Sequence, residues 1–234
     1  MLADTPTSTP GVGALRPGVH RPGAFLRGII DFIAAHLPSW RDDPERPAAA
    51  SERELTAQLA ASLNAAARAH LDIIHFQTER PDPARPSRTI DLAAQPSAQP
   101  IYVAGRRFTK FDLLLPIECK RLPTPSGGRR DPREYVTTGA RPGGGIQRFK
   151  LGLHGSAHTH AILIAYIQSD DPARWLPQIN AWIAEAAAAD PAWTGEELAP
   201  EPAAAPVFRA RSSHSRPAPA AAIEISHLWI RLKS

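Results

Sequence analysis

The chain has 234 residues, of which 43% are hydrophobic and 21% charged, with a formal net charge of +4. This composition suits a soluble globular protein, and the length suits one domain with a buried core. The single cysteine, Cys119, excludes an intrachain disulfide, and no apolar run reaches transmembrane length. The first residues lack the basic start and apolar stretch of a secretory signal, so we expect a cytoplasmic protein that does not bind a membrane.

The prolines and the charges are both unevenly distributed. The 25 prolines gather in residues 1–22, 81–100, 122–144 and 189–206. We expect residues 1–22 to form a disordered N-terminal tail and residues 23–234 a single domain, with a Pro/Ala-rich linker at 189–206. Residues 101–153 hold 11 Lys and Arg against 4 Asp and Glu, so the rest of the chain is slightly acidic. Such a basic region attracts polyanions, although a solvated surface explains it as well.

The first half of the chain predicts two helices followed by strands. Apolar residues at helical spacing predict a helix over 24–37. A second helix begins at Ser51, which forms a capping-box pattern with Glu54. Strands are predicted over 72–79 and 87–95, and a turn near Gly105 leads into one long strand that ends near residue 122.

The second half alternates helices and strands. After the loop, we expect a helix over about 144–154 with basic residues on its outer side. A covered central strand follows over 158–168, then a helix over 171–189. Two closing strands, "VFRARSSHSR" and "AAIEISHLWIRLK", predict a C-terminal β-hairpin. This order predicts an α/β (α+β) fold with a mixed sheet flanked by helices.

The stretch "LLLPIECKRLP" places charges at the end of an apolar strand. Glu118 and Lys120 lie two residues apart, so they share one strand face about 6.6 Å apart. Buried charges of this kind must be paired or must coordinate something. A carboxylate that holds a hard divalent cation, beside a lysine that stabilises charge on water or phosphate, suits phosphoryl chemistry.

A metal site of this kind needs a second acid close to Glu118. Asp112 has the same strand parity, but an extended chain would place it about 20 Å away. Asp91 lies on the preceding strand, and antiparallel pairing would bring it beside Glu118. Asp91 is therefore the expected partner.

Asp91 in "RTIDL" and Glu118 with Lys120 in "IECKRL" resemble the motif of the PD-(D/E)XK nuclease superfamily. The resemblance covers about residues 51–168, with a helix before the motif and a helix and strand after it. Ile90 stands where a proline often precedes the acid. The resemblance implies a restriction-endonuclease-like core and a metal-dependent endonuclease that hydrolyses phosphodiester bonds of DNA with Mg²⁺, for which Mn²⁺ would substitute.

The resemblance also implies roles for individual residues. Asp91, Glu118 and the backbone carbonyl of Cys119 would hold the metal ion, and Lys120 would position or deprotonate water. Glu52 is a further candidate ligand, although a first-turn glutamate is also favoured by the helix dipole. The candidate nucleic-acid contacts are Gln147, Arg148, Lys150 and Arg121; Arg121 points away from Glu118 and is alternatively structural.

Several histidines form further groups. His158 and His160 share a strand face, and we expect a packed or hydrogen-bonded pair rather than a metal site. Ser212, His214 and Arg216 alternate onto one face, with His227 opposite them in the predicted hairpin. A nucleic-acid contact, a supporting hydrogen-bond network and a structural polar ladder all remain open for this group.

Two other functions fit the same pattern. One is a non-catalytic nucleic-acid-binding or partner-binding module on the same fold, and the other is an RNA-directed nuclease. For the DNA nuclease, a role in restriction or defence, a two-fold homodimer and a partner protein encoded alongside are expectations.

Overall fold

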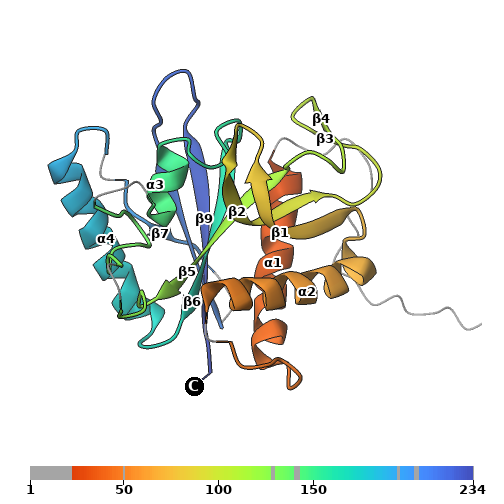
Figure 1. Ribbon diagram of the computed structural model, residues 1–234, viewed down its shortest axis with the longest axis horizontal. Coiled ribbons are helices and arrows are strands. Elements are labelled where there is room, and N and C mark those ends of the chain that lie inside the picture. The colour runs from red at the N-terminus through yellow and green to blue at the C-terminus, as the bar shows by residue number, and fades with distance from the viewer. Residues whose placement is uncertain are drawn as a thin grey trace, which may run out of the picture.

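The computed structural model describes residues 23–49, 51–127, 130–139, 143–193, 196–202 and 206–233. The expected tail over 1–22 lies outside this part of the chain, as do some residues of the expected linker. A seven-stranded sheet forms the centre, with helices against both of its faces (Figure 1). The predicted mixed sheet flanked by helices is therefore confirmed.

In the described part of the chain, four helices cover the sheet: α1 (Ala24–Asp42), α2 (Glu52–His70), α3 (Gly145–Lys150) and α4 (Pro172–Ala189). Ser51 and Glu54 form the predicted capping box at the start of α2. Asp171 caps α4 with its side chain. The helix expected over 144–154 is shorter, because the chain turns at Gly152, which adopts a left-handed φ of 60°.

The strand order is β1-β2-β5-β6-β9-β8-β7. The central trio β5, β6 and β9 is parallel, and the outer strands pair antiparallel. The bounds are β1 (Ile74–Asp82), β2 (Arg85–Pro96), β5 (Leu115–Leu122), β6 (His160–Ile167), β7 (Ala199–Pro200), β8 (Val207–His214) and β9 (Ile223–Arg231). The expected C-terminal hairpin is β8 and β9, while β7 is a short strand within the expected linker.

The single long strand expected before residue 122 is wrong. The chain instead forms a separate two-stranded ribbon, β3 (Ile101–Val103) and β4 (Arg106–Phe108), and starts β5 only at Leu115. The turn between β4 and β5 closes because the Asp112 carboxylate accepts hydrogen bonds from the backbone N–H and the hydroxyl of Thr109.

Two apolar layers hold the helices on the sheet. Ile117 and Cys119 of β5 face α1 and α2, in a cluster that includes Ile33 and Leu59. The opposite face packs against α3 and α4. Since strand side chains alternate, Glu118 and Lys120 point to the α3 side. Among the described residues, no helix is long and apolar enough to cross a membrane.

Gly144 connects the preceding loop to α3 and lies close to the backbone of Val136 and Thr137. A Cβ atom added there would lie 2.3 Å from the Thr137 Cα atom and 2.6 Å from the Val136 carbonyl oxygen. Gly144→Ala should therefore displace α3 and lower the free energy of unfolding by about 1–3 kcal/mol, measured by urea denaturation. Gly139→Ala is the matched control, because its added Cβ would have its nearest neighbour at 4.0 Å. Equal stabilities of the two variants would contradict this account of the loop.

Candidate functional site

The candidate site forms where β2 and β5 part. Their antiparallel ladder ends at the pair Leu92 and Ile117, so among the described residues β5 continues beyond it without a strand partner on that side. Two carboxylates take the place of the missing strand. Asp91 Oδ2 accepts a hydrogen bond of 2.9 Å from the Cys119 N–H, and Glu52 Oε2 accepts one of 3.1 Å from the Arg121 N–H. Both acids thereby satisfy buried backbone donors.

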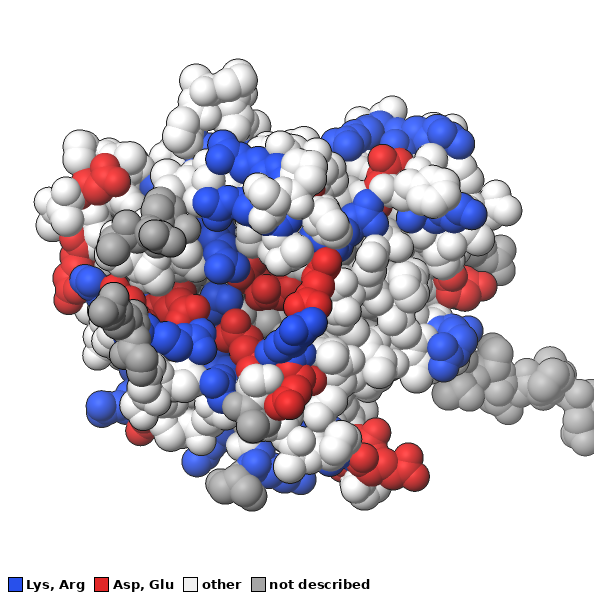
Figure 2. Space-filling view, viewed as in Figure 1, with Lys and Arg blue, Asp and Glu red and all other residues white. Residues whose placement is uncertain are grey.

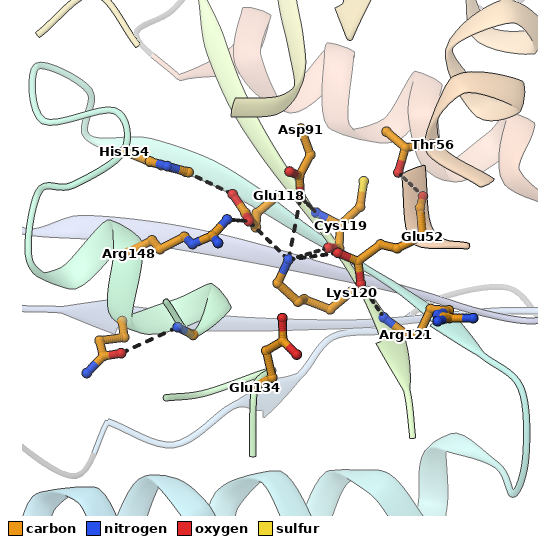
Figure 3. Close-up of polar contacts among 12 residues, drawn as sticks. Glu52, Thr56, Asp91, Glu118, Cys119, Lys120, Arg121, Glu134, Arg148 and His154 are labelled. Carbon is orange, nitrogen blue, oxygen red and sulfur yellow. Dashed lines mark hydrogen bonds and ion pairs between the residues drawn. The ribbon is translucent and has the colours of Figure 1, made fainter. Parts of the chain in front are cut away.

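The ammonium group of Lys120 lies at the centre of this cluster (Figure 3). Its Nζ atom is 3.0 Å from Glu52 Oε1, 3.6 Å from Asp91 Oδ2, 3.1 Å from Glu118 Oε1 and 2.7 Å from the Cys119 carbonyl oxygen. The three acids come from α2, β2 and β5. The antiparallel pairing of β2 with β5 thus brings Asp91 and Glu118 to the same ammonium group, that of Lys120.

Glu118 is fully buried and has partners on both carboxylate oxygens. Arg148 Nη1 and Lys120 Nζ donate to Oε1, and His154 Nδ1 lies 2.9 Å from Oε2. Burial favours the neutral acid, but the charge of Lys120 and the contacts with His154 and Arg148 outweigh it, so the pKa of Glu118 lies well below its usual range. Glu118 is therefore a fixed negative charge inside the protein.

Asp91 behaves differently from Glu118. Burial and the negative charge of Glu118 raise the pKa of Asp91 to about 7, although Lys120 and the Cys119 N–H oppose this rise. Its side chain is 26% exposed, and together with Glu52 it lines a pocket of about 270 Å³. The site therefore combines a permanently ionised acid with one that exchanges a proton near neutral pH.

Lys120 remains charged in this environment. Burial lowers the pKa of its ammonium group, but Glu118, Asp91 and Glu52 raise it more, so the pKa lies above the usual value for lysine. The ammonium group thus donates hydrogen bonds and positive charge. This arrangement suits positioning of water or stabilisation of charge better than removal of a proton from water.

Two residues near the cluster were not predicted from the sequence. His154 contacts Glu118 from the turn after α3, and Glu134 turns its carboxylate toward the cluster from the segment before α3 (Figure 3). Gly152 and Gly155, which flank His154, both adopt a left-handed φ of 60°. These glycines were the available signal that the helix ends early and presents His154 on a turn.

The predicted nucleic-acid contacts fall in different surroundings. Arg148 reaches the cluster through Glu118. Arg121 is half-buried at the end of β5. Gln147 Oε1 accepts hydrogen bonds from the backbone N–H groups of Thr138 and Gly143 and thus braces the start of α3. Of these three, Arg148 contacts a predicted catalytic residue through its side chain, at Glu118.

Lys150 is buried, so the expectation that α3 carries its basic residues on the outside is wrong for this position. Its ammonium group donates to the Ser215 carbonyl at 3.1 Å and lies 3.8 Å from Glu196. The six-residue helix turns this side chain toward the β8–β9 end of the molecule, where it packs over the Trp193 ring.

The serine–histidine group forms a buried chain of hydrogen bonds. Ser212 Oγ lies 2.7 Å from His214 Nε2 and 2.8 Å from His227 Nε2, and His227 Nδ1 lies 2.8 Å from the Tyr135 hydroxyl. Burial lowers the pKa of His214 to about 4 and lowers that of His227 as well. Arg216 leaves this group and donates to backbone carbonyls.

The remaining predicted side chains have local partners. His158 Nε2 lies 2.8 Å from the Leu113 carbonyl oxygen, as expected for a hydrogen-bonded core histidine. His160 Nδ1 lies 3.0 Å from the Thr159 hydroxyl. Asp112 holds the Thr109 turn and does not join the cluster at Lys120.

The oxygen atoms around Lys120 are of the kind that binds a hard divalent cation, but they are not arranged as a metal site. Three carboxylates and a backbone carbonyl supply oxygen ligands, which Mg²⁺ prefers. In the described part of the chain, no group of three or more His, Cys, Asp or Glu side chains is arranged to hold a metal ion. The Lys120 ammonium group occupies the centre of the oxygen cluster, so a cation would have to share or displace it.

Comparison with protein-family models, with curated proteins and with solved structures finds no match. A functional assignment for this chain therefore depends on the geometry and chemistry of the site.

The pKa of Asp91 predicts how stability depends on pH. The folded protein favours protonated Asp91, since this pKa rises from 3.8 to about 7. The stabilisation is complete below pH 3.8 and is lost as pH rises toward 7, at about 1.4 kcal/mol per pH unit at most. Relative to Asp91→Asn, the wild type should lose stability across this window in urea denaturation with EDTA present.

Asp112→Asn provides the control for this measurement. The hydrogen bonds from Thr109 lower the pKa of Asp112, so its effect on stability has the opposite sign. Parallel stability curves for wild type and Asp91→Asn between pH 4 and 7 would show that Asp91 has an ordinary pKa.

Proposed function

We propose that this chain is a metal-dependent endonuclease with a restriction-endonuclease-like fold, and that it hydrolyses phosphodiester bonds of DNA. The observation that carries the proposal is the oxygen cluster of Asp91, Glu118 and the Cys119 carbonyl around Lys120. Acids from adjacent strands supply oxygen ligands for a metal ion, and the lysine beside them supplies positive charge for a phosphate; metal-assisted phosphodiester hydrolysis can use both.

In this proposal, Asp91, Glu118 and the Cys119 carbonyl hold Mg²⁺, with Glu52 as a further ligand. The bound cation would supply a Lewis acid for the phosphate and would lower the pKa of a water molecule. Lys120 keeps its positive charge and orients that water or stabilises charge on the phosphate. His154 holds the Glu118 carboxylate in one orientation from the opposite side.

The surroundings of the site support a polyanionic substrate. Acidic side chains gather near the centre of the face shown in Figure 2, interleaved with Lys and Arg side chains, and further Lys and Arg side chains lie above them. The basic side chains attract a phosphate backbone, while the acids attract cations. The proposal therefore places DNA as the partner of a cytoplasmic enzyme, and a two-fold dimer would suit paired cuts on a duplex.

One observation favours a non-catalytic binding module instead. Lys120, Arg148 and His154 already satisfy Glu118, while Asp91 and Glu52 accept hydrogen bonds from β5. The acids of the cluster thus already have partners within the protein. Catalysis requires a metal ion to compete with these internal cations, so the two functions differ in a measurable affinity.

Cleavage assays separate these functions. With Mg²⁺ or Mn²⁺, we expect wild type to cut DNA, and Asp91→Asn and Glu118→Gln to lower the rate about 100-fold or more, because each removes a charged metal ligand. Asp31→Asn, at an exposed acid of α1, is the matched control and should retain activity. Labelled DNA and RNA substrates are compared in parallel, with circular dichroism to verify folding. Undiminished cutting by both site variants, or cutting in EDTA, would refute the proposal.

Arg148 gives a test in which two properties change in opposite directions. Arg148→Ala removes a cation that competes for Glu118, so Mn²⁺ affinity measured by calorimetry should rise on the order of tenfold. The same change removes a positive charge from the phosphate site, so the cleavage rate should fall. Arg174→Ala, an exposed arginine on α4, should change neither. A parallel fall of affinity and rate would assign Arg148 a purely structural role.

A further inference from the structure

The β3–β4 ribbon has one face on the core and one face in solvent. Ile101, Val103 and Phe108 pack toward the core cluster beneath α1. The opposite face carries Tyr102 directly across from Arg107, because these two residues are paired in the ribbon and paired side chains share a face. Tyr102 is 65% exposed. The ribbon therefore fixes an aromatic ring and a guanidinium group side by side at the surface.

A second aromatic ring is held at the surface just after β4. Phe111 is 76% exposed, with the Lys110 ammonium group 5.1 Å from its ring centre. The backbone beneath it is fixed, since Asp112 binds the Thr109 N–H and Arg80 donates to the Phe111 carbonyl. Phe111 is thus presented to solvent by a braced turn.

This concentration of exposed rings is not ordinary scatter. Single exposed apolar residues are common on protein surfaces. Among the described residues, however, Tyr102 and Phe111 are the exposed large hydrophobic residues, and both lie within residues 101–111. The same stretch carries Arg106, Arg107 and Lys110 and no acidic residue. Aromatic rings interleaved with basic side chains are the combination that stacks on bases and binds phosphates.

The ribbon is also adjacent to the candidate active site. Arg106 and Phe111 line a hollow of about 100 Å³ together with Gly155, the residue that follows His154. His154 contacts Glu118. In Figure 2, Lys and Arg side chains (blue) extend from the area above the central acidic side chains to the region of β3 and β4, which Figure 1 labels. A strand lying on the ribbon would therefore continue toward the cluster.

We propose that the β3–β4 ribbon binds a nucleic-acid strand with unpaired bases, with Tyr102 and Phe111 stacking on bases and Arg107 and Lys110 binding phosphates. As a description of substrate class, this inference rests on the proposed nuclease function. The bases of a continuous duplex already stack on one another, so the rings of Tyr102 and Phe111 cannot stack on their faces. The preferred ligand is therefore a single strand or a duplex with an unpaired segment.

Binding is measured separately from cleavage. Fluorescence anisotropy in EDTA compares a labelled mixed-sequence DNA single strand with its blunt duplex. Wild type should bind the single strand more tightly. Tyr102→Ala and Phe111→Ala should each weaken that binding about five- to a hundredfold, the effect expected for loss of one stacked base. Tyr102→Phe and Phe111→Trp keep a ring and should retain affinity, whereas Phe111→Leu should not.

Charge variants and a membrane control complete the test. Arg107→Ala and Lys110→Ala should each make the slope of log affinity against log salt concentration shallower by about the amount expected for one phosphate contact. Arg174→Ala should leave this slope unchanged. Affinity unaffected by both alanine variants of the rings would overturn the inference. Tighter binding to vesicles containing anionic lipid than to the oligonucleotide would also overturn it.

The same data distinguish this inference from the proposed function. Ring-dependent binding without metal-dependent cleavage supports the ribbon and refutes the nuclease. Cleavage that depends on Asp91 and Glu118, together with unchanged binding by Tyr102→Ala and Phe111→Ala, supports the nuclease and refutes the ribbon.

Discussion

The Lys120 ammonium group, held among the carboxylates of Glu52, Asp91 and Glu118, is the interaction on which the site depends. It connects α2, β2 and β5 where the β2–β5 ladder has ended. Removing one partner from a buried ion pair typically costs about 3–5 kcal/mol, because the other charge is left without compensation. The cluster therefore fixes the relative positions of these elements as well as their charges.

The arrangement also creates a competition. Three carboxylates face two permanent cations, Lys120 and Arg148, so ionisation of Asp91 gives the cluster one more negative than positive charge. A divalent cation would find suitable oxygen ligands, but it would have to replace internal ion pairs. The same internal ion pairs that hold the three carboxylates together thus limit the affinity of the cluster for a divalent cation.

Much of this geometry was predictable from local periodicity. Strand alternation places Glu118 and Lys120 on one face of β5. Antiparallel pairing of β2 with β5 brings Asp91 beside them. The contact between Glu118 and His154 was not predictable in the same way, because it depends on where α3 ends and on the turn at Gly152. The turn near Gly105 was predicted, but the break between β4 and β5 at the Thr109 turn was missed, because the apolar residues of β4 continue the pattern of β5.

The proposed function requires the oxygen cluster around Lys120 to accept a divalent cation. Crystals soaked in Mn²⁺ and measured at an anomalous wavelength test this requirement directly. The account predicts one strong peak coordinated by Asp91, Glu118 and the Cys119 carbonyl, with Arg148 moved away from Glu118. A site with Lys120 and Arg148 still bound to Glu118 and no peak, at saturating Mn²⁺, would contradict it.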